Sequence, residues 1–363
     1  MKFVVARRIG RRGEGLGNEM FAWAKGLIAS NVLDATLVGP SWGLNWRKYY
    51  RNFNTNRADW MLEELLCRLP HFAFSEADYR ESGEIDFGRA VESWARRKGL
   101  LERSHFIVTV DGMYGGYPSI RNARPFLWAK LLNSRDALRN IFQVSSALDR
   151  NKLFVAVHIR STVGGHLVLK EGECPRGRFN ICIPGEWYLH VCQALLEKFG
   201  NRIQFHIFTD RGGPEYDEAI RRFNPGQRRQ TGLTECSDLL LMAQADLRVC
   251  SISSYSLIAG FLSGGPYLWY EPQLTAEDSL YTLWGLEEAQ RKPGSITSES
   301  RAFAFMLKPS LEASASIQGH VMATGDALPL GLIVQLERKL QALDPRTNLL
   351  EYGAVPTWAR SGE

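Results

Sequence analysis

Three short polar segments of the sequence could bind an anionic ligand. They are His158-Ile159-Arg160, Thr209-Asp210 and Ser253-Ser254-Tyr255-Ser256. The Arg160 guanidinium offers a fixed fork of donors that suits a phosphate, and serine hydroxyls with the N–H groups of a helix start suit a second phosphate oxygen. The Asp210 carboxylate suits ribose hydroxyls or base N–H donors. Together these groups are typical of a site for a nucleoside diphosphate.

Each segment also has a purely structural interpretation. His158, beside the end of a predicted strand, is explained as well by a hydrogen-bonded structural histidine as by a catalytic one. A serine cluster between a strand and a helix caps the helix about as often as it binds a ligand, and it can do both. The sequence leaves these alternatives open.

No group of residues has the spacing of a divalent-cation site. The six cysteines lie far apart without a CxxC pair, which makes a disulfide scaffold an unfavoured interpretation. The nearest approach to a zinc motif, His190 with Cys192, lacks a second pair of ligands. We therefore expect no metal and no cofactor, so that charge on a departing diphosphate would be met by Arg160 and by backbone dipoles.

The polar segments follow apolar runs that predict buried strands. Strands are predicted at residues 3–6, 105–110, 153–159, 203–208, 247–251 and 267–270. Helices are predicted at 20–29, 184–199 and 328–343. Another begins with a cap at Ser237 and runs through residue 242, and one more follows the serine segment and ends at Ser263. Residues 271–326 show no clear pattern. Alternating strands and helices predict a parallel sheet covered on both faces, and such sheets bind ligands at the carboxyl ends of their strands.

A glycine-rich loop follows the first predicted strand. Gly13, Gly15 and Gly17 resemble a dinucleotide fingerprint, but that pattern requires its third glycine where this chain has Asn18. Nicotinamide binding is therefore not favoured. Glycines at a helix start still allow backbone N–H groups to approach an anion or a sugar closely.

Residues 41–104 are rich in aromatic side chains and arginines and show no clear strand pattern. The favoured interpretation is an irregular, partly helical insertion packed over the first domain, because aromatic side chains are more often core than site. The alternative is an acceptor surface, since aromatic rings stack on the apolar faces of sugars.

Four segments resemble the alpha-1,2-fucosyltransferases of glycosyltransferase family eleven, in the fucosyltransferase superfamily. Residues 15–30 (GLGNEMFAWAKGLIAS) resemble the family's GLGNQMF opening, and residues 155–161 (VAVHIRS) resemble its HxRRxD motif. Residues 205–210 (FHIFTD) resemble its FxxFSDD strand, and residues 238–262 resemble the segment that ends in NSSFSWWGAWL. The resemblance covers about the first 30 residues and 153–270.

The resemblance implies an α/β chain of GT-B architecture, with two Rossmann-like domains facing across a cleft. We expect an acceptor-side domain at 1–150, a nucleotide-sugar domain at 151–345 and a tail at 346–363. The implied reaction is metal-independent, inverting transfer of L-fucose from GDP-fucose to a hydroxyl of a glycan. The implied binding residues are Arg160 for the diphosphate, Ser253, Ser254, Tyr255 and Ser256 for the phosphate pocket, Asp210 for the nucleoside, and Gly15, Gly17 and Asn18 for the loop of the first domain.

Departures from the family pattern leave the donor open. Ser161 stands where the motif has its second arginine, and Arg211 stands where the strand motif has its second aspartate. Related peptide-O-fucosyltransferases also keep only the first arginine. The alternatives are a GT-B transferase that uses another GDP- or UDP-sugar, and a non-catalytic protein that binds nucleotides or carbohydrates.

Inversion requires a base that removes the proton of the attacking hydroxyl. Spacing alone selects none, and the candidates are Glu14, Glu19 and Asp111. Glu14 ranks first because it lies on the glycine loop that would face the donor. Arg160, Glu14 and His158 are thus the predicted catalytic residues.

Length, composition and net charge limit the classes of protein to which the chain can belong. The chain has 363 residues, is 45% hydrophobic and carries a net charge of +5, as is typical of a globular protein with two domains. The mild basic excess does not favour a nucleic-acid partner, which more often comes with a dense basic stripe. The sequence does not indicate the acceptor or the oligomeric state.

The long uncharged stretch at 249–270 is interrupted by five serines, three glycines and Pro266, so we predict strand, loop and helix rather than a membrane span. The first residues lack the apolar segment of a signal peptide. We expect a cytoplasmic protein. One alternative is that it lies at the membrane face and takes part in the synthesis of a membrane-associated polysaccharide. The basic residues Arg7, Arg8, Arg11 and Arg12 would either hold the anionic donor or rest on that face.

Overall fold

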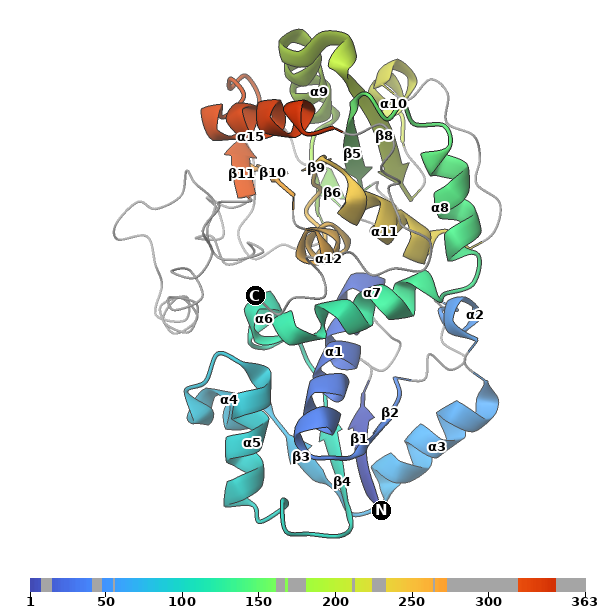
Figure 1. The fold of residues 1–363 in the computed structure, drawn as a ribbon, viewed down its shortest axis with the longest axis vertical. Helices are drawn as coiled ribbons and strands as arrows, with labels where there is room; N and C mark the ends of the chain where they lie inside the picture. Colours follow the sequence, from blue (N-terminus) through green and yellow to red (C-terminus); the bar gives the residue numbers. More distant parts are fainter. Residues whose placement is uncertain are drawn as a thin grey trace.

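The computed structural model in Figure 1 contains two parallel sheets with helices packed on them. It describes residues 1–7, 15–40, 48–54, 56–160, 167–168, 181–210, 213–223, 233–263, 265–272 and 319–343. The α/β class with parallel sheets, predicted from the sequence, is confirmed. The first sheet lies within residues 1–150, which we call the first half, and the second sheet lies within residues 151–343, which we call the second half.

The first sheet has four parallel strands in the order β2-β1-β4-β3. They are β1 (Lys2–Ala6), β2 (Thr36–Val38), β3 (Phe72–Phe74) and β4 (Phe106–Val110). Helices α1 (Leu16–Val32) and α5 (Phe87–Arg97) bury their apolar residues on one face, together with Val4 and Val108. On the other face Leu66 of α3 (Arg57–Arg68) meets Val5 and Val38.

Shorter helices connect these elements. They are α2 (Tyr50–Phe53), α4 (Glu76–Ser82), α6 (Gly116–Ser119), a 3-10 turn at Arg121–Ala123, α7 (Arg124–Leu132) and α8 (Ala137–Ser145). Helices α3 and α4 each begin with a capping box. The side chains of Asn56 and Ser75 accept from the backbone N–H groups of Asp59 and Asp78, and the carboxylates of Asp59 and Asp78 accept from the backbone N–H groups of Asn56 and Ser75.

The second sheet has five parallel strands in the order β11-β10-β9-β5-β8. They are β5 (Leu153–Ile159), β8 (Ile203–Thr209), β9 (Leu247–Val249), β10 (Tyr267–Tyr270) and β11 (Gly319–Met322). A separate pair joins β6 (Leu167–Val168) to β7 (Ile181–Cys182). All seven residues of β5 are buried, as expected of a strand covered on both faces.

Helices cover both faces of the second sheet. Alternate residues of β5 point to opposite cores, with Val155 in one and Phe154 in the other. The Val155 side is covered by α9 (Gly185–Phe199), α10 (Asp217–Phe223) and α15 (Leu330–Gln341), and the Phe154 side by α11 (Glu235–Gln244) and α12 (Ser254–Leu262).

A single apolar core joins the two sheets. It runs from Val4 in the first sheet through α1, α7, α11 and α12 to Phe154 in the second, and these four helices lie between the sheets in Figure 1. The indole N–H of Trp128 on α7 donates to the carbonyl of Leu262 on α12 at 2.9 Å. Helices α7 and α8 precede residue 150 but pack against helices of the second half. A division into domains at that residue stays a prediction.

Most strands and helices predicted from the sequence are confirmed with small shifts at their ends. Five short strands were not predicted, namely β2, β3, β6, β7 and β11. Of these, β3 and β11 fall in segments expected to be irregular. The cap predicted at Ser237 is wrong: α11 begins at Glu235, and the Ser237 hydroxyl donates back to the Thr234 carbonyl at 2.8 Å inside the helix.

The aromatic side chains of 41–104 that the structure describes pack mainly into the core. Trp94 is 1% exposed and lies in an edge-to-face contact with Phe74. The favoured interpretation of these aromatics as core is confirmed for Trp94, whereas Trp42 and Trp46 lie outside the described residues. The segment is not simply an insertion, because β3 supplies the outer strand of the first sheet.

The uncharged stretch at 249–270 forms the end of β9, then α12, then β10, as predicted. In the part of the chain that the structure describes, no helix has both the length and the apolar content to cross a membrane.

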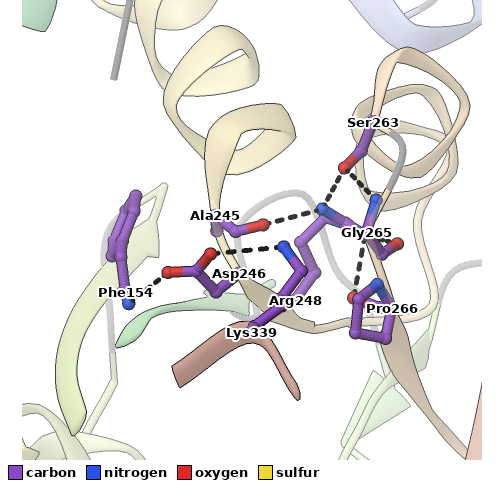
Figure 2. Close-up of polar contacts among 8 residues, drawn as sticks. All are labelled: Phe154, Ala245, Asp246, Arg248, Ser263, Gly265, Pro266 and Lys339. Atoms are coloured by element: carbon purple, nitrogen blue, oxygen red, sulfur yellow. Dashed lines mark hydrogen bonds and ion pairs between the residues drawn. The ribbon is translucent and has the colours of Figure 1, made fainter. Parts of the chain in front are cut away.

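A buried arginine braces the amino-terminal end of the second sheet (Figure 2). The Arg248 side chain is 0% exposed, and its guanidinium donates to the carbonyls of Ala245 at 3.2 Å and Pro266 at 2.8 Å, and also to Ser263 Oγ and the Gly265 carbonyl. Burial lowers the pKa of Arg248 to about 10, so the side chain remains charged at neutral pH.

A carboxylate beside this brace ties three elements together. Asp246 accepts from the Phe154 backbone N–H at 2.8 Å and from the Lys339 ammonium at 3.2 Å. The turn before β9, the start of β5 and helix α15 are thereby joined at one point (Figure 2).

Candidate functional site

The order of strands in the second sheet creates a topological switch point at its carboxyl edge. From β5 the chain first forms β8 on one side, and it later returns to form β9 on the other side of β5. The loops that follow β5 and β9 therefore lead away in opposite directions, which is where open parallel sheets bind ligands. Arg160 directly follows β5, and the serine segment follows β9.

Arg160 and the start of α12 meet at this switch point. The Arg160 guanidinium donates to Ser253 Oγ at 3.2 Å, and the same oxygen accepts from the Tyr255 backbone N–H at 3.2 Å. Ser253 is therefore the N-cap of α12 and also a link to the arginine. A partly buried guanidinium beside the positive end of a helix is suited to bind an anion.

The start of α1 reaches the same place. Gly17 lies so close to α12 that a Cβ atom at this position would be 2.5 Å from the Ser254 carbonyl oxygen, so only glycine fits. Gly15 is the N-cap of α1 and has no side chain to cap the helix, while Leu16 N donates to the Tyr49 hydroxyl at 2.9 Å. The positive ends of two helices thus converge beside Arg160.

Asn18 belongs to the first turn of α1. Its side-chain Oδ1 is buried and has no hydrogen-bond partner in the part of the chain that the structure describes. Buried polar atoms are nearly always paired, so an orphaned amide oxygen beside the two helix starts suits a ligand that carries donors. The sequence predicts that Gly15, Gly17 and Asn18 form a loop of the first domain, but Gly17 and Asn18 lie in the first turn of α1. Their role in binding a donor stays a prediction.

His158 is buried beneath the serine segment. Its Nδ1 lies 2.7 Å from Ser256 Oγ and 3.1 Å from Ser251 Oγ, and Ser256 Oγ also accepts from the Ser251 backbone N–H at 3.1 Å. Burial, reinforced by the Arg160 charge and opposed by Asp210, lowers the pKa of His158 to about 4. The ring is therefore neutral at neutral pH and holds the loop after β9. Its catalytic role stays a prediction.

The remaining members of the serine segment divide into two groups. Ser253 and Ser254 form the start of α12, against Arg160 and Gly17. Ser256 is 1% exposed, and the Tyr255 hydroxyl donates to the Glu235 carbonyl. The first two thus lie at the helix start, whereas Tyr255 and Ser256 hold the loop. Donor binding by the four residues stays a prediction.

Asp210 follows β8, and β8 is paired with β5, the strand that Arg160 follows. β5 and β8 are in register up to Ile159 and Thr209, so Arg160 and Asp210 each leave the sheet edge side by side. The Asp210 residue is exposed. The charge of Arg160 lowers the pKa of His158 and the charge of Asp210 raises it.

The three candidate bases have different surroundings. Glu14 lies outside the described residues. Glu19 is 0% exposed on α1, whereas Asp111 is exposed after β4 and has its backbone carbonyl 3.4 Å from the Lys25 ammonium. Of the two described carboxylates, only Asp111 is open to a substrate.

Sequence reasoning missed several side chains around the site. Lys25 is fully buried on α1 with its ammonium 3.1 Å from the centroid of the Tyr114 ring, and burial lowers its pKa well below the ordinary value. Tyr49 and Asn52 contact the starts of α1 and α11. None carries a motif, because each is defined by packing between distant segments. Among the described residues there is no group of three or more metal-ligating side chains.

No protein-family model and no curated protein matches the sequence. Three similar solved structures are crystal structures of POFUT1. A GDP-fucose complex has a TM-score of 0.39 and 16% identity over 73% of this chain and 97% of that chain. A second crystal form of the complex has a TM-score of 0.40 and 17% identity, covering 73% and 96%. The apo form has a TM-score of 0.38 and 17% identity, covering 72% and 94%. At these scores the site must be assigned from its own geometry.

Proposed function

We propose that the chain is an inverting glycosyltransferase whose nucleotide-sugar donor binds between Arg160 and the start of α12. The observation that carries this proposal is the hydrogen bond from Arg160 to Ser253, the N-cap of α12, at the switch point of the second sheet. A guanidinium and a helix N-terminus that lie side by side complement a diphosphate. The choice of GDP-fucose as donor and a glycan as acceptor rests on the sequence motifs.

In the proposed reaction an acceptor hydroxyl attacks the anomeric carbon as the bond from that carbon to the diphosphate oxygen breaks. Negative charge grows on the departing diphosphate, and Arg160 with the N–H groups of α12 would stabilise it. The hydroxyl proton passes to a carboxylate. Glu14 is the first candidate for this base, and exposed Asp111 is the described alternative.

A second candidate function is nucleotide or carbohydrate binding without transfer. The observation that favours it is Ser161, which stands where the resembled motif has a second arginine. A leaving diphosphate would therefore have one cationic side chain fewer to stabilise it. A transferase that uses another GDP- or UDP-sugar remains the alternative among enzymes.

A nucleotide panel tests the proposal. We expect GDP, present at about 100 times its Kd, to stabilise the protein by about 2.7 kcal/mol in thermal unfolding. UDP, ADP and inorganic pyrophosphate serve as comparisons, and release of GDP from GDP-fucose in the presence of a glycan library measures transfer. Absence of stabilisation by every nucleotide would contradict donor binding, and GDP binding without GDP release would favour the non-catalytic function.

A further inference from the structure

Two buried residues at helix α2 contact the starts of other helices. Tyr49 is 7% exposed, and its hydroxyl accepts from the N–H of Leu16, the first residue of α1, at 2.9 Å. Asn52 is 1% exposed, and its amide donates to the carboxylate of Glu235, the first residue of α11, at 3.1 Å. We call Tyr49 and Asn52 the α2 clasp.

The clasp is anchored on its other side. The Asn52 carbonyl accepts from the Arg135 backbone N–H, between α7 and α8, at 2.7 Å, and the Asn52 amide also lies 3.7 Å from Cys236 Sγ. These contacts span up to 184 positions of sequence. A short segment of the first half is thus fixed to helices that cover the second sheet.

The clasp reaches α12 through Glu235. The backbone carbonyl of Glu235 accepts from the Tyr255 hydroxyl, while the Tyr255 backbone N–H donates to Ser253 Oγ, the oxygen that Arg160 also contacts. A continuous set of hydrogen bonds therefore leads from Asn52 to Arg160. Tyr49 separately holds the first N–H group of α1, next to the close contact of Gly17 with Ser254.

We propose that Tyr49 and Asn52 are positioning residues for the donor phosphates. They fix the starts of α1 and α12 against each other, so that the positive ends of both helices lie beside one anion at Arg160. This inference rests on the proposed function. The favourable field of a helix N-terminus falls off within its first turn, so displacement of either start weakens phosphate binding without removing any group that touches the ligand.

The first test is Tyr49→Phe, which removes only the hydroxyl. We expect the Kd for GDP, measured by isothermal titration calorimetry, to rise about fivefold, the equivalent of one ordinary hydrogen bond. Tyr79→Phe is the matched control, because the Tyr79 hydroxyl is also buried and donates to the Ile85 carbonyl at 2.6 Å in the first half. The control loses stability to a similar extent and leaves the Kd for GDP unchanged.

The second test exchanges a donor and an acceptor. Asn52→Asp sets two carboxylates against each other and weakens GDP binding, whereas Asn52→Asp combined with Glu235→Gln restores an amide-to-carboxylate hydrogen bond in the reverse direction. We expect the double variant to recover the Kd to within about twofold.

The outcomes separate the two proposals. Rescue of GDP affinity by the double variant supports the positioning role. A wild-type protein that binds GDP, with Tyr49→Phe and Asn52→Asp binding it equally tightly, overturns the role of the clasp and leaves the proposed function standing. A wild-type protein that binds no nucleotide contradicts the proposed function itself.

Discussion

Two arginines at opposite ends of the second sheet show how differently one side chain can be used. Arg248, at the amino-terminal end, is 0% exposed and surrounded by oxygen atoms of the protein, most of them backbone carbonyls (Figure 2). Arg160, at the carboxyl-terminal end, is partly exposed and shares its serine partner with a helix cap. The first is a closed brace, whereas the second lies where loops diverge. A buried charge alone is therefore not a sign of function.

The largest effect on stability is expected at the brace. Arg248→Met keeps the apolar stem but takes the guanidinium donor away from the carbonyls of Ala245 and Gly265, so we expect the free energy of unfolding to fall by about 3–5 kcal/mol. Urea denaturation measures it, with the exposed Arg89→Met as control. A loss below about 1 kcal/mol would show that the cluster does not brace the sheet.

The same change at the other end should act on the reaction instead. Arg160→Met removes a donor to the departing diphosphate, which we expect to add about 2–4 kcal/mol to the barrier and to slow transfer about 30- to 1000-fold. Its unfolding free energy should change by no more than about 1 kcal/mol. Steady-state turnover and urea denaturation of the same preparation test both statements, and full turnover by a folded variant would eliminate the proposed role.

Acid should affect the Arg160 end through His158. The pKa of His158 is about 4 in the folded protein, below the ordinary value of 6.5, so its contribution to stability is complete above pH 6.5. That contribution, up to about 3 kcal/mol, is lost as the pH falls from 6.5 to 4. Burial also lowers the pKa of His206 to about 4, so both histidines act in this window.

The measurement is the pH dependence of the unfolding free energy. We expect His158→Gln to show a shallower decline between pH 6.5 and 4 than the wild type, because one of the two titrating rings is gone. His71→Gln, at an exposed position, is the control. Identical slopes for His158→Gln and the wild type would mean that His158 is not held neutral by its surroundings.

The sequence predicted best the parts of the fold that are continuous apolar runs. β5 and β10 were predicted with their exact ends, because a strand buried on both faces is a nearly continuous apolar run, interrupted in β5 only by His158. β2 and β3 have three residues each, too few to display a period, and Ala73 in β3 is exposed. Such strands are formed by pairing with their neighbours rather than by their own pattern.

The site was predictable where it depends on strand ends. Arg160 and Ser253 each follow a strand, and their contact requires only that β5 and β9 be adjacent. That adjacency, and with it the switch point, cannot be read from the order of strands in the chain. The contact of Tyr49 with Leu16 and of Asn52 with Glu235 depends on how separate segments pack, and neither leaves a local signature.

The core that passes between the two sheets has a thermodynamic consequence. Val4 and Phe154 belong to one set of buried side chains, with α1 and α12 in contact between them. Unfolding either sheet would expose apolar surface that the other sheet covers, so the stabilities of the two halves are coupled. The polypeptide should therefore melt in one cooperative transition, in which damage to the closed brace around Arg248 also lowers the population of molecules able to bind a nucleotide at Arg160.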